Sequence, residues 1–530
     1  MKFIALIASS LSLIILISCS GSGSSSSASG TAPTSGTAPD TSNTYTSFAS
    51  ALQSYIAADQ AGSSSTDNKS SSMNSSIILG ADYFADIPAI MTANYGYGGY
   101  MGVDNLTDNG ATTIPGCGSP CSLSTQQSVA YAAGVSFENL DPSLQATGRA
   151  YYTAVGTTNF QSTYAVSPAQ MSQGPLATIP VVFTHPVWPP SLTPAAFSVT
   201  LNTGAVVTPV AVSLLPNTEY NERQNPILIG YFGNRITSGS SAIYPVSVTI
   251  VNSPTVLRLV TPAGLLSAVG LTKTSENSYI SGNGSKLLAA KLNVYSSLGE
   301  SNPSWNAPAY ANSGYDLYGT SAWYRLRLYT SAGFSPDGIS SIMPTDFSKY
   351  FILYATDGSG NIIQMTQTGV SYSIPGYGSV TIVGLADTGA LQSSYNMAYL
   401  EDHDNYYDVI LTGDAAAIAR LSRVQVPSSG AYSAVYNPGG PGNNPSSNPP
   451  GILFTVPSSD HSVSVTNSLS TGNFVSYVTI GCSPTLNAKG QPIGTFQGVA
   501  VINNATGYNV NQYIDSNNCI FYASFPVSSK

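Results

Sequence analysis

Apolar and polar residues alternate along much of the chain from about residue 178 onward. In Phe197–Leu201, large apolar side chains alternate with Ser and Thr, and Asn202-Thr203-Gly204 then supplies a turn signal. Val246–Ile250 repeats the alternation. A period of two is typical of strands with one buried face. Short strands separated by turn residues predict an antiparallel β-sandwich of immunoglobulin-like architecture, extending over residues 178–262.

A second region with strand periodicity covers residues 286–430. Tyr324, Leu326 and Leu328 alternate with Trp, Arg and Tyr. Further on, Asp357-Gly-Ser-Gly-Asn361 separates two apolar runs, which is a signal for a β-hairpin. One helix is expected, from Asp414 at the N-cap to Arg423, because Ala415–Ala419 is rich in alanine.

These patterns predict a mainly β, multi-domain chain with a few short helices. The expected parts are a signal peptide (1–18), a lipidated Cys with a Ser/Gly-rich tether (19–44), an N-terminal mixed region (45–177), the sandwich (178–262), the second β-rich domain with one helix (286–430), a Pro/Gly/Asn linker (437–451) and a C-terminal β-rich segment (452–530).

Composition changes this picture by excluding one class of partner. Charged residues form 8% of the chain, against about 25% in an ordinary soluble domain. The net charge is −9, and no cluster of Lys and Arg stands out. Nucleic acids are recognised through clustered basic side chains that displace counterions. We therefore expect no nucleic-acid partner and a folded protein with neutral polar surfaces.

The N-terminal residues have the pattern of a targeting signal. Met1-Lys2 is followed by an apolar run that ends in Leu16-Ile17-Ser18-Cys19. One positive charge, an apolar stretch and a small residue before the break are typical of a secretory signal. The ending resembles the lipobox of bacterial lipoproteins, a resemblance that covers residues 1–19 only. It implies that Cys19 is acylated and anchors the chain to the bacterial cell envelope, with Ser20 favouring the outer membrane.

The other cysteines are Cys117, Cys121, Cys482 and Cys519. An even number in an oxidising compartment predicts two disulfides. Three pairings are open, and proximity in sequence favours Cys117–Cys121 and Cys482–Cys519. The alternative for the first pair is a metal site, although no second ligand pair stands nearby.

A concentration of acids lies at residues 401–408. Oxygen ligands from Asp402, Asp404, Asn405 and Asp408 suit Ca²⁺, although the spacing is not that of an EF-hand. A solvated acidic loop, or one paired with Arg420 and Arg423, is the alternative. His403 leaves a transition metal open as well.

Signs of catalysis are sparse. The Gly-x-Ser-x-Gly elbow, His-Glu-x-x-His and the Walker A sequence are all absent. Glu219 and Glu222 are candidate paired carboxylates of a glycosidase. His185, beside Trp188, is a candidate metal or sugar ligand, and the alternative is a histidine that hydrogen-bonds at the end of a strand.

Aromatic side chains give the remaining lead. Tyr and Trp present flat apolar faces that suit protein and glycan contacts. The candidates in glycine- or serine-rich contexts are Tyr95, Tyr97, Tyr100, Trp305, Tyr315, Tyr318 and Trp323. The sequence thus favours a lipid-anchored envelope protein that binds a protein or glycan partner. The alternative is an envelope glycan hydrolase with paired carboxylates, dependent on calcium.

Overall fold

The computed structural model describes residues 84–95, 176–213 and 224–275 with short gaps. It also describes residues 285–295, 314–331, 342–388, 406–428 and 460–469, together with short segments elsewhere. This part of the chain is mainly β, and its sheets are largely antiparallel. The predicted fold class is therefore confirmed.

The first core is a β-sandwich. Within the described ranges, its larger sheet has seven strands in the order β27-β10-β11-β7-β3-β6, and β2 also pairs with β7. Their bounds are β2 (Ile90–Ala93), β3 (Tyr100–Val103), β6 (Ala154–Gly156), β7 (Leu176–Phe183), β10 (Ala211–Ser213), β11 (Ile227–Gly230) and β27 (Val501–Asn503).

The facing sheet has the order β15-β12-β8-β9. Its strands are β8 (Phe197–Leu201), β9 (Val206–Val207), β12 (Pro245–Ile250) and β15 (Thr272–Thr274), with the 3₁₀ helix η4 (Pro194–Ala196) leading into β8. Val199 and Val248 from this sheet pack with Ile179 and Val181 of β7 in one fully buried cluster. The strands predicted at 197–201 and 246–250 are confirmed. Gly204 makes the turn between β8 and β9 with a φ of 84°, a conformation that glycine adopts without strain.

The second core lies beneath a nine-stranded sheet of the described chain, ordered β19-β18-β23-β24-β16-β17-β22-β21-β20. Its strands are β16 (Leu287–Val294), β17 (Tyr324–Thr330), β18 (Ile352–Thr356), β19 (Ile362–Met365), β20 (Ser371–Ile374), β21 (Gly378–Ala386), β22 (Tyr406–Gly413), β23 (Leu421–Val426) and β24 (His461–Asn467). The short helices are α7 (Gly314–Tyr318), η5 (Gly319–Ser321), α8 (Phe347–Tyr350) and α9 (Ala415–Ile418).

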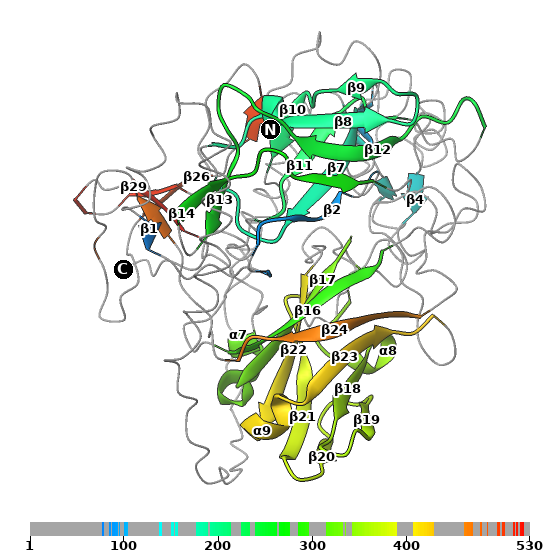
Figure 1. Cartoon of the computed structure of the whole chain (residues 1–530), viewed down its shortest axis with the longest axis vertical. Coiled ribbons are helices and arrows are strands. Elements are labelled where there is room, and N and C mark those ends of the chain that lie inside the picture. The colour runs from blue at the N-terminus through cyan, green and yellow to red at the C-terminus, as the bar shows by residue number, and fades with distance from the viewer. Residues whose placement is uncertain are drawn as a thin grey trace, which may run out of the picture.

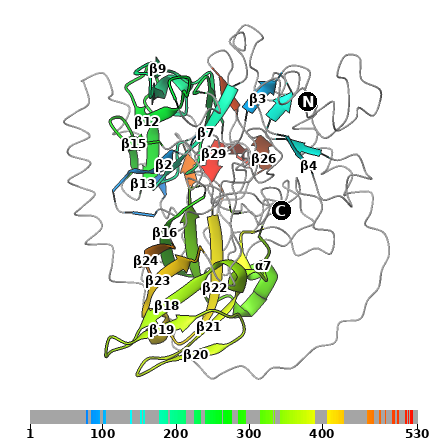
Figure 2. The same cartoon turned by 90° about the vertical axis from the view of Figure 1, so that its right-hand side faces the viewer.

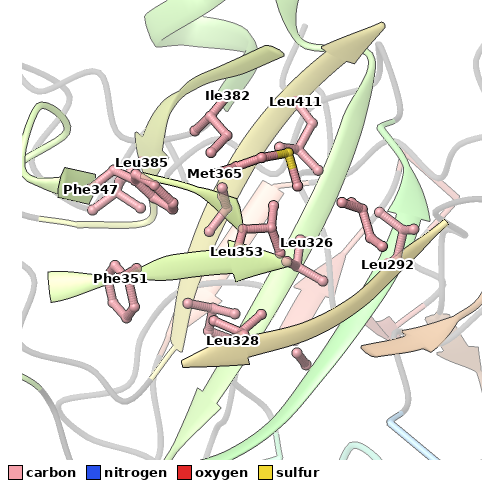
Figure 3. Close-up of a cluster of buried hydrophobic side chains, with 14 of the residues drawn as sticks. Leu292, Leu326, Leu328, Phe347, Phe351, Leu353, Met365, Ile382, Leu385 and Leu411 are labelled. Carbon is pink, nitrogen blue, oxygen red and sulfur yellow. The ribbon is translucent and has the colours of Figure 1, made fainter. Parts of the chain in front are cut away.

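Side chains of this second core come from strands far apart in sequence. Figure 3 shows Leu326 and Leu328 of β17 close to Leu353 of β18 and Met365 of β19. All four side chains are fully buried. The predicted hairpin at 357–361 is confirmed, because β18 and β19 pair antiparallel on either side of it.

The predicted helix over 414–423 is wrong beyond residue 418. The chain leaves α9 and enters β23 at Leu421, where Val424 and Val426 are buried against the second core. Asp414 does take the N-cap position, but its carboxylate accepts a hydrogen bond from the Ser379 amide at 2.7 Å instead of capping the helix. Burial of alternate side chains thus outweighs the helix propensity of the alanines.

Strand pairing crosses the linker predicted at 437–451. Strand β24 follows that segment, yet it lies inside the nine-stranded sheet, antiparallel to β23 and parallel to β16. The predicted C-terminal segment therefore contributes a strand to the second domain. The remaining described strands are β1 (Ile77–Ile78), β25 (Tyr477–Thr479), β26 (Thr495–Gly498), β28 (Gln512–Ile514) and β29 (Ile520–Ala523) in one sheet, β13 (Arg258–Thr261) with β14 (Gly264–Ser267), and β4 (Phe137–Asn139) with β5 (Ala150–Tyr152).

The two cores follow one another along the long axis of the molecule. Strands β8, β9 and β12 lie toward one end and β19, β20 and β21 toward the other (Figure 1), and the view at 90° agrees (Figure 2). Between them, Val182 of β7 packs with Tyr329 of β17 and Tyr406 of β22.

Candidate functional site

The acidic segment is described from Tyr406 onward, so Asp402, Asp404 and Asn405 lie outside the described residues. Asp408 lies in β22 between Tyr407 and Val409, which both belong to the second core. Its side chain therefore points to the opposite face of the sheet. There its register partner on β17 is Arg327.

Arg327 holds this carboxylate at both oxygens. Its Nε donates to Oδ1 of Asp408 at 2.8 Å and its Nη2 donates to Oδ2 at 2.7 Å. A bidentate guanidinium is the strongest neutralising partner that a buried carboxylate finds in a protein. The structure thus gives Asp408 an arginine where the sequence predicted a calcium ion. The partner is Arg327 and not Arg420 or Arg423, and the calcium hypothesis is left with the three residues before β22.

A second carboxylate joins the same arginine. Asp387, directly after β21, accepts from Nη2 of Arg327 at 2.8 Å. Its φ is +56°, in the left-handed region that non-glycine residues rarely occupy. We call Arg325, Arg327, Asp387 and Asp408 the ion cluster, and all four are buried. The Nη1 of Arg325 lies 3.8 Å from Oδ2 of Asp408.

The ion cluster has the composition of a catalytic site but not its accessibility. A general acid or nucleophile must contact substrate and exchange a proton or a bond with it. Asp387 and Asp408 are instead covered by protein and hydrogen-bonded to Arg327. Tyr406, beside the cluster, donates to Gln224 next to the sandwich at 3.3 Å, and its ring meets that of Tyr329 edge-on. Strand β22, which carries Asp408, therefore contacts the sandwich through Tyr406. Glu219 and Glu222 lie outside the described residues.

His185 is also part of this junction. It is fully buried, and its Nδ1 lies 2.9 Å from Oγ1 of Thr184. Burial, and secondarily the charge of Lys291, lower the pKa of His185 to about 3. The imidazole is consequently neutral at neutral pH. A fully buried ring offers no face to a sugar, so the alternative reading, a hydrogen-bonded histidine at the end of a strand, is the one that the structure supports.

The Asp357 loop has a structural explanation. Oδ1 of Asp357 accepts hydrogen bonds from the amides of Ser359 and Asn361, both at 2.8 Å. Hydrogen bonds, first from the side chain of Asn361, lower the pKa of Asp357. The carboxylate closes the turn between β18 and β19. The described residues contain no group of three or more His, Cys, Asp or Glu side chains that could hold a metal ion.

The aromatic candidates separate into different environments. Tyr95 is completely buried in the first core. The hydroxyl of Tyr318 donates to the Leu385 carbonyl at 2.6 Å, and burial raises its pKa. Among the described aromatic residues, only Trp323 is exposed, with 41% of its surface accessible. Tyr97 and Trp305 lie outside the described residues, as do the side chains of Tyr100 and Tyr315.

Trp323 lies directly before β17 and is anchored by hydrogen bonds of its side chain and its backbone. Its indole N–H donates to the Thr320 carbonyl in η5 at 2.6 Å, and its backbone amide donates to Leu411 of β22 at 3.3 Å. The next residue, Tyr324, is the first of β17 and faces the second core, whereas the side chain of Trp323 is exposed. Because its only polar atom is already bonded, the exposed part of the ring is apolar.

A row of hydroxyl groups continues from Trp323 across the sheet. Trp323 directly precedes β17, its amide bonds Leu411 of β22, and Thr412 is the next residue along that strand. The register then runs from Thr412 to Thr381 and from Thr381 to Ser371. Adjacent strands lie about 4.8 Å apart. We call Trp323, Thr412, Thr381 and Ser371 the Trp323 row. Its three hydroxyl residues are half-buried or exposed, and no side chain in the row is charged.

Sequence reasoning found one member of this row and missed the others. Thr412, Thr381 and Ser371 occupy polar positions of three alternating strands, which was the available signal. Which strands are neighbours, and in which register, is decided by tertiary pairing.

The predicted lipidation site and disulfide residues, Cys19, Cys117, Cys121, Cys482 and Cys519, lie outside the described residues. In the part of the chain that is described, helices are too short to span a bilayer. Neither a known family model nor a curated protein is similar enough to this chain to count as a match.

Proposed function

We propose that this protein is an outer-membrane lipoprotein, anchored through Cys19, whose folded part binds a neutral glycan at the Trp323 row. The observation that carries the binding proposal is an exposed indole, hydrogen-bonded to Thr320, that directly precedes β17 next to strands carrying three aligned hydroxyl groups. The proposed outer-membrane location and lipid anchor rest on the N-terminal sequence.

The chemistry of the row matches a sugar better than a charged partner. A pyranose ring has an apolar C–H face and a rim of hydroxyl groups. Trp323 offers the C–H face a flat apolar partner. The hydroxyls of Thr412, Thr381 and Ser371 offer donors and acceptors to the hydroxyl groups of the sugar. Because the indole is already fixed by Thr320, binding costs little side-chain entropy. The row itself carries no charge, and the nearest described carboxylate, Asp414, is hydrogen-bonded to Ser379.

The binding test uses the whole mature protein and a panel of neutral polysaccharides: chitin, cellulose, dextran and mannan. Trp323→Ala is expected to lower affinity at least tenfold, since large aromatic contacts commonly contribute 1.4 kcal/mol or more, on the order of an interface hot spot. Trp323→Phe should retain part of the affinity, because it keeps a flat ring. The measurement is a pull-down for insoluble polymers and calorimetry for soluble ones.

Ile362→Ala is the matched control, because Ile362 is a large exposed apolar residue on β19, at 66% exposure, and is not part of the row. Its affinity should equal that of the parent. Equal binding by parent and Trp323→Ala would contradict the proposal. Binding of proteins from the envelope in place of any polysaccharide would favour a protein partner, and released reducing sugar would favour the hydrolase.

The proposed lipid anchor is tested separately. Cys19→Ala should abolish labelling with palmitate and move the protein from the membrane fraction to the soluble fraction, because the acyl chain supplies the anchor. Unchanged labelling and fractionation of this variant would contradict lipidation at Cys19. In the same compartment we expect the disulfides Cys117–Cys121 and Cys482–Cys519, detectable as linked peptides under non-reducing conditions.

A further inference from the structure

A second uncharged surface lies on the outer face of the sandwich. Alternate residues of three adjacent strands are all Ser or Thr: Ser198 and Thr200 on β8, Ser247 and Thr249 on β12, and Thr272 and Thr274 on β15. The register arranges them in two rows, Thr200–Ser247–Thr274 and Ser198–Thr249–Thr272. We call these six residues the hydroxyl face.

The core beneath explains why these six side chains share one face. Val199 and Val248, between them in sequence, are fully buried in the first core. Side chains two residues apart in a strand are about 6.7 Å apart, and neighbouring strands are about 4.8 Å apart. The hydroxyl face is therefore a regular two-dimensional array and not a single line like the Trp323 row.

Most of the array is available to a ligand. Thr249 and Thr272 share a hydrogen bond of 2.8 Å between their hydroxyls, and Thr272 also reaches the Val248 carbonyl at 3.2 Å. The hydroxyls of Ser198, Thr200, Ser247 and Thr274 have no protein partner among the described residues. These four groups are half-buried or exposed, so water or a ligand completes their hydrogen bonding.

The surroundings select the class of ligand. The charged residue of these strands, Lys273, alternates with Thr272 and Thr274 and so belongs to the opposite face, in register with Val248. The exposed Val206 of β9 lies at the border, next to Thr200. A face without charge gives no ion pair to nucleic acids or acidic polymers. A face without an apolar centre lacks what a stable protein interface needs. A neutral glycan, rich in hydroxyls and laid flat, matches it.

We propose that the hydroxyl face is a second binding site for the neutral glycan, which makes the protein bivalent. This inference rests on the proposed function of the Trp323 row. Strand β12 lies near one end of the molecule and β20 near the other (Figure 1). One short oligosaccharide does not reach both sites, whereas a long polymer or two neighbouring polymers do. Bivalency then raises the overall affinity for polymer far above that for oligosaccharide.

The test counts sites by calorimetry on the mature protein, titrated with a short oligosaccharide of whichever polysaccharide in the panel binds. The parent should bind two molecules per chain. The triple variant Thr200→Val, Ser247→Ala, Thr274→Val should bind one, and so should Trp323→Ala. The triple variant should also lose at least tenfold in affinity for the polymer. Thr274→Val alone, on edge strand β15, is the milder variant if the triple substitution alters the melting temperature.

The matched control is Ser462→Ala, Ser464→Ala, Thr466→Val, which removes three exposed hydroxyls from the single strand β24. It should still bind two molecules. If the parent binds one oligosaccharide per chain, and Trp323→Ala loses this binding while the triple variant keeps it, the second site is overturned. The proposed function then still stands. One molecule lost only in the triple variant supports the hydroxyl face and overturns the Trp323 row. No binding by the parent overturns both.

Discussion

In strands β8, β12 and β15 of the sandwich, the residues that alternate with the core are serines and threonines, half-buried or exposed. In strand β17 of the second core, the residues that alternate with Leu326 and Leu328 include Arg325 and Arg327, and both are buried. The two regions have the same period of two. They differ in what covers the polar face.

The cause lies in neighbours that are distant in sequence. The polar face of β17 and β22 packs against the first core through Val182 and Phe84, and against α7 through Leu317. Buried charges cost several kcal/mol each unless they are paired. Asp408 and Asp387 supply that pairing for Arg327. A polar alternation therefore indicates a shared face but does not indicate an exposed one.

The largest expected effect comes from breaking this pairing. Asp408→Ala removes the bidentate partner of Arg327 and leaves a buried guanidinium that lacks it, with a cost to the free energy of unfolding of about 3–5 kcal/mol. Chemical denaturation of parent and variant at pH 7 measures the difference.

An ion pair with one exposed partner is the matched control. Nζ of Lys349 lies 2.8 Å from Asp346, but its side chain is 59% exposed, so Lys349→Ala should cost less than about 1 kcal/mol. Similar losses in the two variants would contradict a large contribution of the buried ion pair to stability.

A smaller effect is expected from acid. The pKa of His185 is about 3 in the folded protein and 6.5 for the free side chain, so the unfolded chain takes up this proton first. Stability is complete above pH 6.5 and is lost as the pH falls toward 3. The loss is at most about 1.4 kcal/mol per pH unit.

Unfolding midpoints measured from pH 7 to pH 4.5 test this slope. His185→Gln lacks the titrating group, so its stability should fall less steeply over this range than that of the parent. Parallel curves for the two proteins would contradict a buried neutral His185. They would also show that this residue does not cause the loss of stability in acid.

Local sequence settled much of the strand content. Phe197–Leu201 forms a strand because large apolar side chains at every second position bury one face, and Asp357 closes its hairpin with bonds to residues two and four positions later. Such short-range signals are readable because both partners lie in the same few residues. The alanine run after Asp414 shows their limit, since its helix ends where Leu421 begins to contribute to the core.

The candidate sites depended on the tertiary structure. Arg327 and Asp408 are 81 residues apart, and the acidic segment gives no sign of which arginine it meets. Thr412, Thr381 and Ser371 line up only because three strands pair in one register. The sequence by itself determined a mainly β chain with neutral polar positions on its strands. Which of those positions face solvent was decided by the fold, because periodicity orients side chains about a strand and packing between distant strands chooses the side that is covered.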